Sequence, residues 1–142
     1  MISWTRAEQF MAEGKAAGLK IQVVEDHEDT LLLMRLMLEQ RGHRVAEAAD
    51  GEEAVEVAWR ECPDVILMDL TLPKVDGFTA AKRIREDPQM RDVPIVAVTA
   101  HIEQQYRANA LDAGMTAFVT KPLDFDCLDE LLGSLVEAKQ PV

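Results

Sequence analysis

The chain has few cysteines and no cluster of them. Cys62 and Cys127 are the two cysteines among 142 residues, and neither belongs to a C-x-x-C or Cys/His motif. A disulfide framework or a zinc centre needs several such residues at close spacing. The composition therefore argues against both. We expect two free thiols in a reducing compartment, which favours a cytoplasmic protein.

Long apolar runs and basic residues are also scarce. No stretch is long and apolar enough to span a bilayer, and the N-terminus lacks the apolar segment of a signal peptide. There are 15 Lys and Arg residues against 26 Asp and Glu residues, a formal net charge of −11. Nucleic acids and anionic membranes both select basic surfaces, so we expect neither as a partner.

What the chain does have is a regular alternation of two patterns after residue 18. Short β-branched or apolar runs, typical of strands, occur at 20–25, 43–49, 64–69, 93–100 and 115–122. Helical patterns separate and follow them, at 29–42, 50–62, 76–87, 102–114 and 124–139. This order predicts an α/β fold, a doubly wound five-stranded parallel sheet with five helices on its two faces.

Residues 1–18 stand apart from the alternation. Trp4, Phe10 and Met11 fall near one face of a helix. We predict an N-terminal arm or short helix over 1–18, followed by a single domain over 19–142. Too few residues follow the last expected helix for an output domain.

Polar residues with reactive side chains gather where the expected strands end. The first strand ends in Glu25 and Asp26, and the third ends in Asp69. The fourth ends in Thr99 and the fifth in Lys121. Ligands of open parallel sheets bind outside the carboxyl ends of the strands. Loop capping alone would scatter such residues, so we predict a functional site at this end of the sheet.

Three carboxylates in one crevice would repel one another unless a cation joins them. Mg²⁺ or Mn²⁺ suits carboxylate and carbonyl oxygens together with water. We expect Asp26 and Asp69 to be direct ligands and Glu25 to act through water. The backbone carbonyl of Thr71 could complete the set.

The same residues suit phosphoryl transfer. Lys121 offers a positive charge and Thr99 a hydroxyl donor to an incoming anion. Asp69 offers a lone carboxylate as a nucleophile, which would form an aspartyl phosphate. The alternative for Asp69 alone is a loop-capping residue.

These motifs resemble the receiver domain of two-component response regulators, the CheY-like family. They are the acidic pair Glu25–Asp26, "DLTLPKVDGF" around Asp69, "VTA" at Thr99 and "KP" at Lys121–Pro122, in the order and spacing of the family. The resemblance covers about Leu19 to Lys139 and departs from the family's commoner pattern in having Glu25 rather than aspartate. It implies a flavodoxin-like strand order of 2-1-3-4-5 and a cis peptide bond between Lys121 and Pro122.

The resemblance also implies a function. A sensor histidine kinase or a histidine phosphotransfer protein would donate a phosphoryl group to Asp69 in the presence of Mg²⁺. Thr99 would then move toward the phosphoryl group, and Phe118, at the family's aromatic-switch position, would move inward. The surface of the fourth helix, fifth strand and fifth helix would change its preference for a downstream protein, whose identity the sequence does not give. Such a protein is a stand-alone signalling switch, not an enzyme, and catalyses only its own phosphorylation and dephosphorylation.

The expected fifth helix bears on oligomeric state. It is acidic, with no evident basic complement for a charge-paired dimer, so we expect a monomer or weak homodimer. Its acidic residues are Asp124, Asp126, Asp129 and Glu130.

Three other functions fit parts of the sequence. A phosphorylation-independent scaffold on the same fold would be indicated by a missing acceptor or lysine, and both are present. A flavin-binding protein would need a phosphate-cradling loop after the first strand, where this chain has "EDHED". A dehalogenase-type phosphatase would need a second acid two residues after Asp69, where Thr71 stands.

Overall fold

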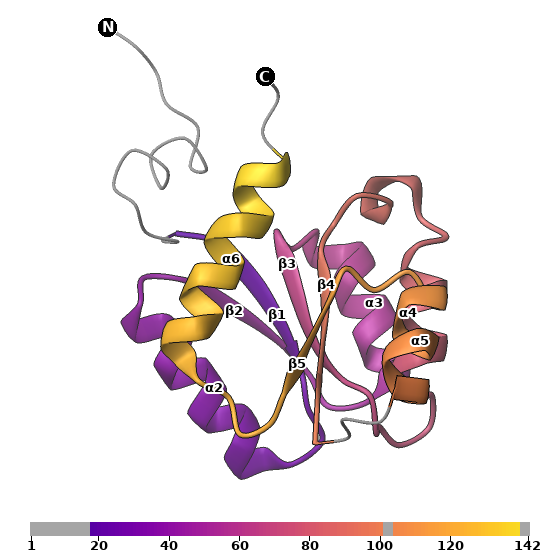
Figure 1. Cartoon of the computed structure of the whole chain (residues 1–142), viewed down its shortest axis with the longest axis horizontal. Helices are drawn as coiled ribbons and strands as arrows, with labels where there is room; N and C mark the ends of the chain where they lie inside the picture. The colour runs from indigo at the N-terminus through magenta and orange to yellow at the C-terminus, as the bar shows by residue number, and fades with distance from the viewer. Residues whose placement is uncertain (1–17, 101–103, 140–142) are drawn as a thin grey trace, which may run out of the picture.

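The structure, a computed structural model, describes residues 18–100 and 104–139 (Figure 1). The arm predicted over 1–18 therefore lies almost entirely outside the described residues. The strands are β1 (Lys20–Val24), β2 (Arg44–Ala48), β3 (Val65–Asp69), β4 (Ile95–Thr99) and β5 (Ala117–Thr120). The helices are α2 (Glu28–Gln40), α3 (Gly51–Glu61), α4 (Gly77–Ile84), α5 (Gln104–Asp112) and α6 (Phe125–Lys139), with a short 3₁₀ helix, η1 (Pro88–Met90).

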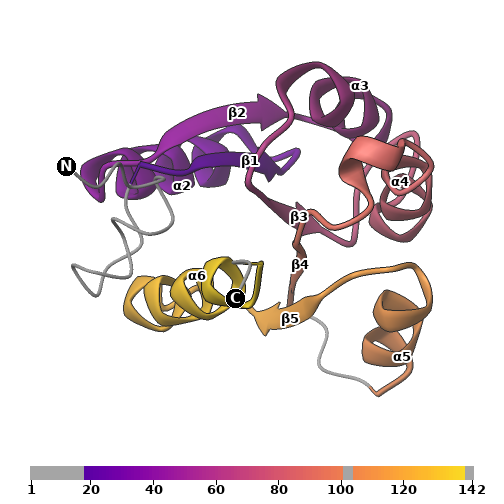
Figure 2. The same cartoon turned by 90° about the horizontal axis from the view of Figure 1, so that it is seen from above.

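The strands form one parallel sheet in the order β2-β1-β3-β4-β5. This confirms the predicted fold, including β2 at one edge. Helices α2 and α6 cover one face of the sheet, and α3, α4 and α5 cover the other (Figure 2). Among the described residues, no helix is both apolar enough and long enough to cross a membrane.

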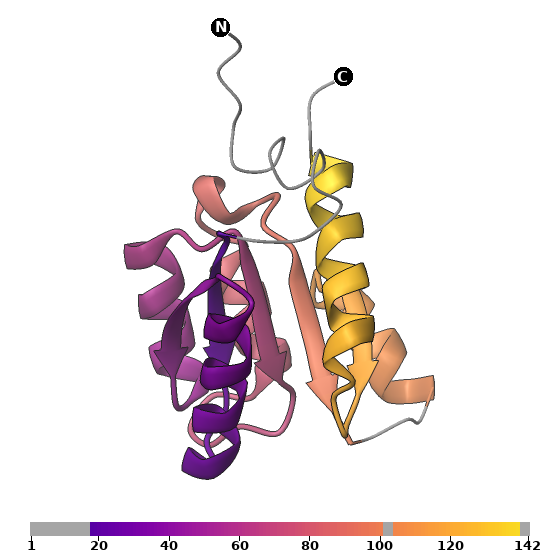
Figure 3. The same ribbon diagram turned by 90° about the vertical axis from the view of Figure 1, so that its left-hand side faces the viewer.

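Burial on both faces explains the unbroken apolar runs of the central strands. In β3, Val65 and Leu67 belong to the core beneath α2 and α6, whereas Ile66 and Met68 belong to the core beneath α3, α4 and α5. Successive strand residues point to opposite faces, so a strand covered by helices on both sides has no polar face. All strands run in one direction and bring their carboxyl ends to the same end of the sheet (Figure 3).

Most helix boundaries follow local signals in the sequence. The carboxylate of Asp50 accepts a hydrogen bond from the Glu53 N–H at 2.8 Å, as expected of an N-cap. Gly42 and Gly114 follow α2 and α5 with φ angles of 89° and 91°, where a side chain would be strained. Cys62 and Cys127 are exposed free thiols, as predicted.

The helix predicted over 76–87 is shorter than expected and ends at Ile84. The residue before a proline avoids helical geometry, and Asp87 before Pro88 has φ −78° and ψ 122°. The carboxylate of Asp87 then caps η1 by accepting from the Gln89 N–H at 2.9 Å. The guanidinium of Arg85 donates to three backbone carbonyls of the turn that follows.

Candidate functional site

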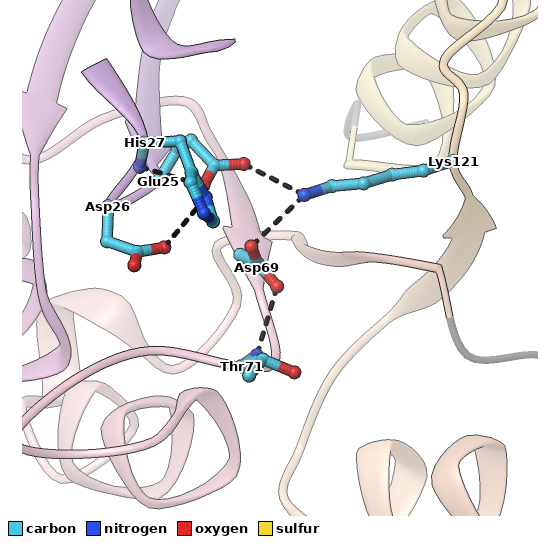
Figure 4. A network of polar contacts seen from close by, with 6 residues as sticks. All are labelled: Glu25, Asp26, His27, Asp69, Thr71 and Lys121. Atoms are coloured by element: carbon cyan, nitrogen blue, oxygen red, sulfur yellow. Dashed lines mark hydrogen bonds and ion pairs between the residues drawn. The ribbon is translucent and has the colours of Figure 1, made fainter. Parts of the chain in front are cut away.

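Four predicted residues come together at the carboxyl end of the sheet (Figure 4). Glu25 and Asp26 follow β1, Asp69 is the last residue of β3, and Lys121 follows β5. The Lys121–Pro122 peptide bond is cis, as predicted. Residues far apart in the chain therefore share one site because the parallel strands end at the same level.

Lys121 is bonded to two of these carboxylates. Its Nζ lies 2.9 Å from Glu25 Oε1 and 3.1 Å from Asp69 Oδ2. Burial lowers the pKa of Lys121, but the two carboxylates outweigh this and the net pKa is raised. Lys121 is therefore a fixed positive charge at this end of the sheet.

Glu25 is almost fully buried and held at both oxygens. Its side chain is 1% exposed, and Oε2 accepts a hydrogen bond from the His27 N–H at 3.2 Å. Burial raises the pKa of Glu25, but the hydrogen bonds from Lys121 and His27 outweigh it and bring the pKa from 4.5 to about 2. Glu25 therefore remains ionised despite its burial.

The pKa of Asp69 is shifted upward, in the opposite direction from that of Glu25. Its Oδ1 accepts a hydrogen bond from the Thr71 N–H at 3.0 Å, and Oδ2 faces Lys121. Burial raises the pKa of Asp69, and these two contacts offset the rise only in part. The contact with Thr71, which the loop-capping alternative would explain, uses one oxygen and leaves the other facing the ammonium.

Asp26 provides the test of whether the site suits a cation. Its Oδ1 is buried and accepts no hydrogen bond from the described residues, although the His27 ring Nδ1 lies 3.4 Å away as an ion-pair partner. A buried carboxylate oxygen that accepts no hydrogen bond is costly unless a positive charge, a cation or water satisfies it. With Glu25 adjacent, the donor set is all oxygen and suits Mg²⁺. The part assigned to the Thr71 carbonyl remains a prediction.

Thr99 and Phe118 lie on the neighbouring strands. Thr99 ends β4, is 1% exposed, and its carbonyl accepts from the Lys121 N–H at 2.8 Å. Phe118 on β5 is half-buried and packs against the core beneath α3, α4 and α5. This backbone hydrogen bond connects Thr99 to Lys121, whose ammonium contacts Asp69.

The sequence analysis missed His27. Its ring Nδ1 lies 3.0 Å from Glu25 Oε2 and 3.4 Å from Asp26 Oδ1. The hydrogen bond to Glu25, together with the charge of Asp26, raises the pKa of the exposed His27 ring. The signal was its position, directly after the acidic pair and directly before α2.

Gly77 is the second omission. A Cβ atom added to Gly77 would lie 2.5 Å from the Asp69 carbonyl oxygen and 2.9 Å from Leu70 Cα. The N-terminus of α4 therefore packs directly on the backbone that carries Asp69. The Asp-Gly pair at 76–77 was the available signal, since Asp76 caps α4 and Gly77 permits the close approach.

The fold and this arrangement of acids and lysine define a class of protein. The sequence profile of the response regulator receiver domain matches residues 21–133, and the chain belongs to this family. Receiver domains are switches of two-component signalling rather than enzymes; they bind Mg²⁺ and work with histidine kinases.

Two relatives show how much of a known response regulator the chain covers. The chain is 36% identical over 120 residues to the response regulator PleD of Caulobacter vibrioides, covering 84% of this chain but only 26% of PleD. It is 33% identical over 103 residues to the polar-differentiation response regulator DivK of Brucella anthropi, covering 72% of this chain and 84% of DivK. The chain thus spans about a quarter of PleD and most of DivK.

A solved structure gives a similar picture. The receiver domain of the sensor histidine kinase PA1611 from Pseudomonas aeruginosa PAO1 is 40% identical, with a TM-score of 0.79 over 85% of this chain and 99% of that domain. That crystal structure has a magnesium ion coordinated in the active site cleft. The likeness covers nearly all of the compared domain.

Proposed function

We propose that Asp69 accepts a phosphoryl group from a phosphohistidine of a sensor histidine kinase or a histidine phosphotransfer protein. One observation carries the proposal. The buried carboxylate of Asp69 is fixed between the Lys121 ammonium and the Thr71 N–H, at the end of the sheet where Glu25 and Asp26 also lie. The raised pKa of Asp69 supports the same role, because a more basic carboxylate is a better nucleophile.

The transfer balances without any further reactant. A carboxylate oxygen of Asp69 attacks phosphorus and forms an O–P bond while the P–N bond of the donor histidine breaks. The donor imidazole, protonated at its other ring nitrogen, leaves with the bonding electron pair as neutral imidazole. Attack of water on the phosphoryl group later restores the carboxylate, releases inorganic phosphate and ends the signal.

The surrounding residues would balance the charge of the phosphoryl group. Asp26, Glu25 and Asp69, with the Thr71 carbonyl, would hold Mg²⁺ or Mn²⁺. That cation would supply positive charge beside the phosphoryl oxygens. Lys121 supplies a second positive charge, and its contacts with Glu25 and Asp69 keep it protonated.

The output of the switch would pass through Thr99 and Phe118. Thr99 would donate its hydroxyl to the phosphoryl group, Phe118 would move inward, and the face formed by α5, β5 and α6 would change its affinity for a downstream protein. The domain over 19–142 would act as a monomer or weak homodimer. Its exposed free thiols support a reducing compartment, the cytoplasm.

Intact-mass analysis after incubation with acetyl phosphate tests this function. The wild type should gain one phosphoryl group in Mg²⁺ and none in EDTA, and the adduct should be labile to base and hydroxylamine. Asp69→Asn should gain none. Asp112→Asn, which removes an exposed carboxylate at the end of α5, is the matched control and should behave as the wild type does.

An adduct that persists in Asp69→Asn would show that the acceptor is another residue. If no adduct forms, a screen of histidine-kinase donors follows. Failure with every donor would favour the phosphorylation-independent scaffold.

A further inference from the structure

The side chain of Arg107 lies over the ring of Phe118, on β5. The guanidinium carbon of Arg107, on α5, lies 5.1 Å from the centroid of the Phe118 ring. A cation within about 6 Å of an aromatic centroid is attracted to the face of the ring. Arg107 is exposed and Phe118 is half-buried, so the contact closes over the ring from the solvent side.

The strand register connects this ring to the site. Phe118 pairs with Ala97, and the next pairs along the two strands are Val98 with Val119 and Thr99 with Thr120. Side chains alternate along a strand, so Phe118, Ala97 and Thr99 share one face of the sheet. Ala97 is small and fully buried. The ring therefore lies beside a small residue on the sheet face that it shares with Thr99, and the guanidinium of Arg107 lies over the ring.

Helix α5 is anchored independently of this contact. The ring of Tyr106 lies 6.0 Å from that of Phe78, centroid to centroid, at an interplanar angle of 43°. Phe78 belongs to α4. This contact ties α5 to α4 one residue before Arg107, so the backbone that carries Arg107 has a support that does not depend on Phe118.

We propose that Arg107 is a positioning residue that holds Phe118 outward and so opposes the switch. The inference rests on the proposed function, in which Phe118 moves inward when Asp69 is phosphorylated. The inward movement would break the stack on Arg107. An exposed cation–π contact contributes enough to bias a two-state equilibrium about 2- to 5-fold, so loss of the cation should favour the inward state by that factor.

Phosphorylation kinetics provide the first test. In Mg²⁺ and acetyl phosphate, Arg107→Gln should be phosphorylated about 2- to 5-fold faster than the wild type. Arg107→Lys keeps the cation and should stay close to the wild type. Arg83→Gln, which removes an exposed arginine from α4, controls for the change in net charge. An Arg107→Gln rate equal to that of the wild type, or to that of Arg83→Gln, overturns the proposal.

A double-mutant cycle separates the stack from other effects of Arg107. In a Phe118→Leu background the ring is gone, so Arg107→Gln should no longer change the rate. A rate increase of the same size in that background would mean that Arg107 acts elsewhere, and it would overturn the proposal.

Fluorine NMR gives a readout that does not need phosphorylation. The chain has four phenylalanines, and para-fluorophenylalanine labelling followed by Phe118→Leu identifies the resonance of Phe118. Arg107→Gln should shift this resonance toward its position in the beryllofluoride-bound wild type, and Arg107→Lys should not. If no variant is ever phosphorylated, the proposed function fails. An unmoved Phe118 resonance would overturn the role of Arg107 on its own.

Discussion

Lys121 Nζ lies 2.9 Å from Glu25 Oε1, although the strands that precede these two residues are not neighbours in the sheet. Strands β3 and β4 lie between β1 and β5, so the side chain of Lys121 reaches past the ends of both strands to contact Glu25. The same nitrogen is 3.1 Å from Asp69 Oδ2. One lysine thus balances two carboxylates and connects the two halves of the sheet at their carboxyl ends.

Removing that lysine should destabilise the fold. In Lys121→Met, the carboxylate of Glu25, which is 1% exposed, loses its counter-charge. We expect the free energy of unfolding in EDTA to fall by about 2–4 kcal/mol, as measured by urea denaturation. Lys82→Met on α4 removes an exposed lysine and should change the free energy of unfolding by no more than about 0.5 kcal/mol. Equal effects of the two substitutions would contradict the charge-balancing role.

The ionisation of Glu25 should make stability depend on pH. Its pKa is lowered from 4.5 to about 2 on folding, so its contribution is present above 4.5 and is lost as pH falls toward 2. In EDTA, wild type should therefore exceed Glu25→Gln in unfolding free energy by on the order of 2 kcal/mol at neutral pH, and by less as pH falls through this window. Denaturation curves measured over the range give this difference. A constant difference would contradict the assignment.

Magnesium should stabilise the protein through Asp26. A ligand that binds only the folded state at about 100 times its dissociation constant adds about 2.7 kcal/mol to the unfolding free energy. Thermal melting of the wild type should therefore shift upward with Mg²⁺ concentration. Asp26→Asn should remove most of this shift, whereas Asp29→Asn, at an exposed position in the first turn of α2, should retain it. A full Mg²⁺ response in Asp26→Asn would exclude it as a ligand.

Gly77→Ala should disturb the site without changing any of its polar side chains. The added Cβ would lie 2.5 Å from the Asp69 carbonyl oxygen, and both contacting groups are backbone. We expect a loss of about 1–3 kcal/mol in unfolding free energy from the overpacking. Acetyl phosphate should also modify Asp69 more slowly, because the backbone that carries it must move. Normal phosphorylation kinetics in a folded Gly77→Ala protein would contradict this positioning role.

The placement of Asp69 and Lys121 could be predicted because it depends on topology. Alternating strands and helices predict a parallel sheet, and a parallel sheet brings the ends of its strands together regardless of side-chain detail. The same reasoning does not extend to His27, whose contact with Glu25 depends on the path of a short loop. Nor does it extend to the stack of Arg107 on Phe118, which joins a helix and a strand whose rotation relative to each other no local pattern specifies.

The error at the end of α4 has a different cause. Arg85, Glu86 and Asp87 follow Ile84 and are all compatible with a helix, so the sequence shows no helix breaker before Pro88. Proline instead affects the residue before it, and Asp87 there starts a 3₁₀ helix. Arg85 then stabilises the turn through the carbonyls of Met90 and Arg91, contacts between side chain and backbone that periodicity cannot reveal.

Lys121 follows both of the acids that it contacts, and this order matters while the chain is being synthesised. Glu25 precedes Lys121 by 96 residues and Asp69 precedes it by 52, so both acids are translated long before their counter-charge. If β1 pairs with β3 before Lys121 is translated, the two carboxyl groups meet with no ammonium between them. A product truncated before residue 121 would lack the one ammonium that contacts both Glu25 and Asp69, so these acids would depend on a bound cation or on protonation for charge balance.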